Sequence, residues 1–166
     1  TNTFVGDNAG GATTTASSNT AVGASALLVN STGANNTAIG KDALDTNTTG
    51  SGNVAVGLDA LDANTTASDN TAIGRSSMAA NTTGTANAAL GAYALDANTT
   101  ANDNTAVGYA SLTANTTGVS NVAVGVSALD ANTTGGYNVA VGASALGGSN
   151  TGSENTAVGY NSLLTN

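Results

Sequence analysis

Hydrophobic residues recur along this chain in short clusters separated by polar stretches. One kind of cluster is a run of β-branched and small residues followed by glycine, as in TAVG, TAIG and VAVG. The other is an Ala-Leu pair, and asparagine, threonine, serine and glycine fill the intervals. Short β-branched runs bounded by glycine are typical of strands. The Ala-Leu pieces are too short for a stable helix, so the pattern predicts short strands joined by polar turns.

The clusters recur at a constant interval of 17 residues over the whole chain. Each unit opens with an asparagine, and a glycine follows four residues later in all ten units. The units begin at residues 2, 19, 36, 53, 70, 87, 104, 121, 138 and 155, with no insertion or deletion between them. Because a disordered chain has no reason to keep such register, we interpret residues 1–166 as a single repeat domain.

A unit of this length is too short for a pair of helices, which needs about 30 residues. It fits one coil of a parallel β-solenoid, in which each repeat contacts only its neighbours. We therefore predict an all-β fold, a parallel β-roll of ten 17-residue coils. At about 4.8 Å per coil, the rod would be about 48 Å long.

In such a stack, each position of the unit becomes a column of equivalent residues. The Val/Ile column should be the most buried, with a Leu column as the second apolar column. The first Asn column should hydrogen-bond amide to amide along the stack, and the Gly column should adopt positive φ or allow close backbone approach. The Val/Ile column includes Val22, Ile39, Val56 and Ile73; the first Asn column includes Asn19, Asn36, Asn53 and Asn70; the Gly column includes Gly23, Gly40, Gly57 and Gly74.

The predicted strand is apolar or small on both of its faces. Ala21 and Ala38 fall on one face, whereas Val22 and Ile39 fall on the other, where Val54 joins them. Apolar residues on both faces indicate a strand that is covered on both sides. Since a coil this thin has one interior, we expect another copy of the chain to cover the second face.

Composition excludes several classes of function. Cys, His, Trp and Pro are absent, and two basic residues stand against ten acidic ones, for a net charge of −8. Without Cys or His, thiolate and imidazole metal sites and His-based catalysis are excluded. Two cations are too few for binding a nucleic-acid backbone, and no apolar run is long enough for membrane insertion. We expect no enzyme activity and assign no catalytic, cofactor-binding or metal-ligating residue.

Two groups of side chains are candidates for a binding site. The pairs Asp42/Asp59 and Asp45/Asp62 fall at equal positions of adjacent coils, and we interpret them as solvated surface rather than as a cation site. The position after each glycine varies most, which indicates a side that faces solvent or a partner. Tyrosines at or beside that position form a candidate partner surface: Tyr93, Tyr109 and Tyr160.

The unit NTAVGxxAL…NTTG resembles repeats of bacteriophage tail-fibre and bacterial surface-fibre proteins. It is also similar to head repeats of trimeric autotransporter adhesins, whose unit is usually shorter. The resemblance implies a left-handed β-roll in which three chains wrap one axis, with the Val/Ile column on the inner strand. It further implies an extracellular, cell-surface or virion location, a homotrimer, and attachment to a receptor or glycan.

Together these observations predict a structural or adhesive repeat segment of an extracellular or virion fibre that assembles through stacked coils. One alternative is an ice-binding solenoid, in which an Asn-x-Thr ladder in the NTT segments would form a flat face. A second alternative is a self-assembling filament of an extracellular matrix.

Overall fold

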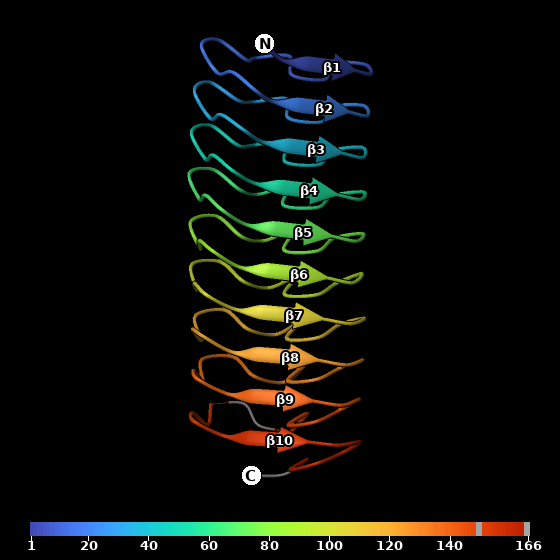
Figure 1. Ribbon diagram of the computed structural model, residues 1–166, viewed down its shortest axis with the longest axis vertical. Helices are drawn as coiled ribbons and strands as arrows, with labels where there is room; N and C mark the ends of the chain where they lie inside the picture. The colour runs from blue at the N-terminus through green and yellow to red at the C-terminus, as the bar shows by residue number, and fades with distance from the viewer. Residues whose placement is uncertain (149–150, 165–166) are drawn as a thin grey trace.

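The computed structural model describes residues 1–148 and 151–164, so residues 149–150 and 165–166 of the repeat domain lie outside the described part. Ten parallel strands form one sheet in sequence order, and no helix occurs among the described residues (Figure 1). The strands are β1 Thr3–Val5, β2 Thr20–Val22, β3 Thr37–Ile39, β4 Val54–Val56, β5 Thr71–Ile73, β6 Ala88–Leu90, β7 Thr105–Val107, β8 Val122–Val124, β9 Val139–Val141 and β10 Thr156–Val158. The predicted all-β parallel solenoid is confirmed.

The register follows the sequence period. Thr20 pairs with Thr37, and Val22 pairs with Ile39, so equivalent residues of adjacent coils lie side by side. Hydrogen bonds between coils continue outside the strands, for example from Leu27 N–H to Ala43 O at 2.9 Å. These bonds satisfy backbone groups around the coil and offset part of the entropy lost by ordering so polar a chain.

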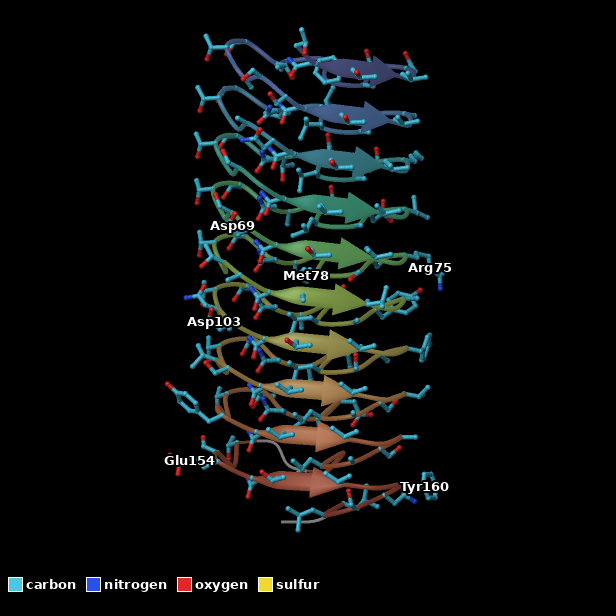
Figure 2. The ribbon with its side chains drawn as sticks, in the orientation of Figure 1. Asp69, Arg75, Met78, Asp103, Glu154 and Tyr160 are labelled. Carbon is cyan, nitrogen blue, oxygen red and sulfur yellow. The ribbon has the colours of Figure 1, made fainter. Side chains whose placement is uncertain are left out.

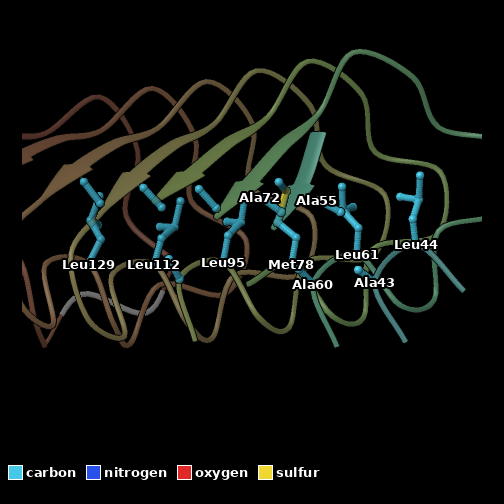
Figure 3. Packing of buried hydrophobic residues seen from close by; sticks show 14 of the residues in the cluster. Ala43, Leu44, Ala55, Ala60, Leu61, Ala72, Met78, Leu95, Leu112 and Leu129 are labelled. Atoms are coloured by element: carbon cyan, nitrogen blue, oxygen red, sulfur yellow. The ribbon is translucent and has the colours of Figure 1, made fainter. Parts of the chain in front are cut away.

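The core is built from alanine and leucine. The middle residue of each strand points inward, and from β2 onward that residue is alanine. The Leu column reaches it from the opposite wall of the coil (Figure 3). The Leu column consists of Leu27, Leu44, Leu61, Met78, Leu95, Leu112, Leu129, Leu146 and Leu163, and its members are fully buried up to Leu146.

The prediction that the Val/Ile column is the most buried is wrong. Val22, Ile39 and Ile73 are 36%, 40% and 37% exposed, whereas Ala21 beside Val22 is fully buried. A three-residue strand turns only its central side chain inward, because successive side chains alternate between faces. The expected alternation of alanine against valine and isoleucine is confirmed, but the alanine side is the closed one.

The Leu column adopts a backbone conformation that leucine rarely takes. Leu44 has φ of 55°, and Leu95 has the same value, in the left-handed region. For a residue with a Cβ this conformation costs about 1 kcal/mol. Glycine would avoid that cost but would leave the core empty, so burial of the leucine side chain outweighs the strain.

The Gly column confirms the predicted close approach of two backbones. Gly40 has φ of 135°, and a Cβ placed on it would lie 2.4 Å from Gly57 O in the next coil. Any side chain there would separate the two coils, which explains the glycine in every unit.

The first coil departs from the repeat at two positions that compensate each other. Phe4 stands where the other coils have alanine, and Gly10 stands where they have leucine or methionine. A Cβ on Gly10 would lie 2.5 Å from Cδ2 of Phe4. The phenyl ring therefore occupies space that the leucine side chain fills elsewhere, which conserves core volume.

Candidate functional site

The first Asn column is buried and forms the expected hydrogen-bonded ladder. The backbone N–H of Asn36 donates to Oδ1 of Asn19 at 2.9 Å, and Nδ2 of Asn53 donates to Oδ1 of Asn36 at 3.2 Å. Asn70 continues the ladder through its backbone N–H, which donates to Oδ1 of Asn53 at 3.0 Å. These side chains hold the stack together and are closed to solvent, so they are not a binding site.

A second Asn column runs beside the first. Nδ2 of Asn47 donates to Oδ1 of Asn30 at 3.0 Å. The two columns meet at Gly50 O, which accepts from Nδ2 of Asn36 at 2.8 Å and from Nδ2 of Asn47 at 2.9 Å. The coils that begin at residues 19 to 121 thus each carry a buried polar network without a titratable group, which specifies the stack.

The Asn and Thr side chains of the predicted ice-binding Asn-x-Thr ladder do not lie together on one exposed face. Asn47 is buried, whereas Thr49 is exposed. Between them, Thr48 Oγ1 donates to Thr65 O at 2.9 Å. The asparagines therefore line the interior, and only one threonine column of the NTT segments faces solvent freely.

The sheet instead presents a different regular surface, which we call the outer strand face. It consists of the first and third residues of strands β2 to β9, which point away from the core. No charged residue lies on it. The first residues are Thr20, Thr37, Val54, Thr71, Ala88, Thr105, Val122 and Val139; the third are Val22, Ile39, Val56, Ile73, Leu90, Val107, Val124 and Val141.

The second exposed surface is the edge of the rod at the arrowhead end of the strands, which we call the glycine edge. Figure 2 shows Arg75 and Tyr160 on this edge, and Asp69 and Glu154 on the opposite one. As expected for a side free of stacking, Tyr160 is exposed, and so are Leu58 and Val126 on the glycine edge.

The structure brings two of the three candidate tyrosines together. Tyr93 and Tyr109 meet edge to face, with ring centroids 6.0 Å apart and planes at 89°. Tyr160 lies three coils beyond Tyr109. Sequence reasoning missed Arg75, whose Cζ lies 4.7 Å from the Tyr93 ring centroid. The sequence places Arg75 in the coil before Tyr93 and in the neighbouring column, and this proximity could have indicated the contact.

The acidic pairs lie in two different columns: Asp42 and Asp59 are two residues beyond the Gly column, and Asp45 and Asp62 directly follow the Leu column. Burial raises the pKa of Asp62, as do the neighbouring carboxylates of Asp45, Asp59 and Asp42. Burial also raises the pKa of Asp45, while Lys41 forms an ion pair with Asp42. Within residues 1–148 and 151–164, no group of three acidic residues is arranged to hold a metal ion, and the surface has no pocket.

No family model, curated protein or solved structure matches this chain. None of the described residues forms a helix that could span a membrane.

Proposed function

We propose that this chain is a structural and adhesive segment of an extracellular or virion fibre, and that three copies assemble with their outer strand faces turned toward one axis. The observation that carries the proposal is the outer strand face itself. Its Val/Ile column is one-third to one-half exposed over most coils of a lone chain, and no charge interrupts it.

Burial of this stripe is the physical driving force for assembly. Contiguous apolar surface along a rod about 48 Å long is typical of an interface, because monomers rarely leave such surface in water. The stripe runs straight along the rod, so a partner of the same length covers all of it. The trimeric state and the left-handed winding come from the resemblance to adhesin heads and remain predictions.

The oligomeric state in solution tests the proposal. Light scattering of the chain should report three copies per particle, and Ile73→Asp should release monomers, because it places a carboxylate in the middle of the interface. Circular dichroism of that variant should still show a folded β-protein. A wild-type chain that stays monomeric at high concentration would contradict the proposal.

An ice-binding function is a second candidate, now on the outer strand face. This face repeats threonine, valine and isoleucine at a spacing of about 4.8 Å, and β-branched side chains on a strand have few rotamers. Such a rigid, uncharged array is suited to ordering water. A monomer that separates the melting and freezing temperatures of its solution would favour ice binding over the fibre, whereas particles of unlimited size would favour a matrix filament.

A further inference from the structure

We propose that Arg75, Tyr93 and Tyr109 form a binding patch for a carboxylate-bearing polysaccharide on the glycine edge. The three residues occupy three successive coils of the same edge. We call them the Arg75 patch. This inference rests on the adhesive role proposed above and does not depend on the mode of assembly.

The backbone holds the patch in a defined arrangement. The N–H of Tyr93 donates to Arg75 O at 3.0 Å, and the N–H of Ala110, next to Tyr109, donates to Ala92 O, next to Tyr93, at 3.0 Å. Tyr93 also has φ of 59°, the conformation shared by its equivalents in other coils. Because the stacked coils fix these Cα positions, binding of a ligand costs little conformational entropy of the backbone.

The tyrosines supply a face for a sugar ring. Tyr109 is 55% exposed, and its contact with Tyr93 is edge to face. Aromatic faces carry partial negative charge, whereas the axial C–H groups of a pyranose carry partial positive charge. The described surface has no pocket, so the ligand would lie along the edge, as an extended polymer does.

Arg75 makes the patch specific for an acidic ligand. It takes no part in the ion pair formed among the described residues, which joins Lys41 to Asp42. Its guanidinium instead contacts the Tyr93 ring, which leaves the N–H donors for a planar acceptor such as a carboxylate. Arg75 and Tyr109 lie two coils apart, about 10 Å, which is roughly the length of two linked pyranose rings.

Polygalacturonate is a suitable probe, because it joins pyranose faces to carboxylates. Its binding to the full chain can be compared with that of neutral dextran and of polyglutamate on a biosensor. Tyr109→Ala and Arg75→Ala should each weaken polygalacturonate binding by about tenfold. Tyr109→Phe keeps the ring and should bind as the wild type does, as should Tyr160→Ala, which removes an exposed tyrosine outside the patch.

The other outcomes overturn the inference. If dextran binds as tightly as polygalacturonate, Arg75 does not recognise a carboxylate. If polyglutamate binds as tightly as polygalacturonate, the ligand is an acidic peptide and not a polysaccharide. Absence of polygalacturonate binding, or binding unaffected by Tyr109→Ala and Arg75→Ala, would exclude the patch. Light scattering of the same samples separates the two proposals: a monomer that binds polygalacturonate contradicts the trimer alone, and a trimer that does not bind contradicts the patch alone.

Discussion

From strand β2 onward, each strand points its small side chain into the core and its larger apolar side chain outward. Most folds do the reverse and bury the larger apolar residue. Ala72 points into the core and is fully buried, whereas the larger Ile73 beside it points outward. The interior has little room on the strand side, because Met78 fills it from the opposite wall (Figure 3). The small residue is inside because the coil is thin, and the large one is outside, where a partner can cover it.

The same comparison explains where the repeat tolerates change. Inside, Phe4 is matched by the loss of a side chain at Gly10, so two departures occur together. Outside, strand β6 replaces the usual residues by Ala88 and Leu90 with no matching change nearby. Interior positions are constrained by volume, whereas outer positions are constrained by polarity and area.

The strongest test introduces the same charge on the two sides of strand β5. Ala72→Asp should prevent folding, because a buried and unpaired carboxylate costs several kcal/mol. Ile73→Asp should leave the coils folded and abolish assembly instead. Circular dichroism and light scattering of both variants measure the two effects. If both unfold, the outer strand face is part of the core and the comparison fails.

A pair of leucines in one coil gives a smaller and graded test. Leu95 is fully buried, whereas Leu90 is 50% exposed on the outer strand face. Leu95→Ala should lower the free energy of unfolding by about 2–5 kcal/mol. Leu90→Ala should lower it by under about 1 kcal/mol under conditions where the chain is monomeric. Denaturant titration measures both, and equal losses would contradict the assigned faces.

Substitution of two glycines by alanine distinguishes the cost of backbone strain from the cost of steric overlap between coils. A Cβ on Gly74 would lie 2.6 Å from Gly91 O, whereas one on Gly159 would meet nothing closer than 4.0 Å. Both residues have positive φ, so each change to alanine should cost about 1 kcal/mol in strain. Gly74→Ala should cost more in a denaturant titration, and an equal cost would show that the coils can separate freely.

The smallest expected effect is electrostatic. Burial and the neighbouring carboxylates raise the pKa of Asp62 in the folded protein. Folding therefore favours its protonated form, and stability is lost as pH rises through the folded-state pKa. Asp62→Asn should raise the melting temperature slightly at pH 7, and the gain should vanish below the ordinary Asp value of 3.8. Asp69→Asn, at an exposed carboxylate on the edge opposite the glycine edge, is the control and should change the melting temperature little. A loss of stability in Asp62→Asn would contradict the assigned burial.

Much of the fold was predictable because a constant period places residue i beside residue i+17 in every coil. That rule alone predicted the strands, their parallel register, the ladder of Asn19 and Asn36, and the backbone approach at Gly40. It could not predict contacts between different columns. Arg75 and Tyr93 belong to neighbouring columns, so the period did not predict that the guanidinium lies against the Tyr93 ring.

The sequence by itself determined the period, the register and the identity of each column, since these follow from spacing along the chain. The tertiary structure decided which face of the strand is closed and which side chains of different columns meet. Both strand faces are apolar, so polarity did not distinguish Ala38 from Ile39. The path of the rest of the coil distinguishes them, because the left-handed backbone conformation at Leu44 directs a large side chain against the alanine face of the strand.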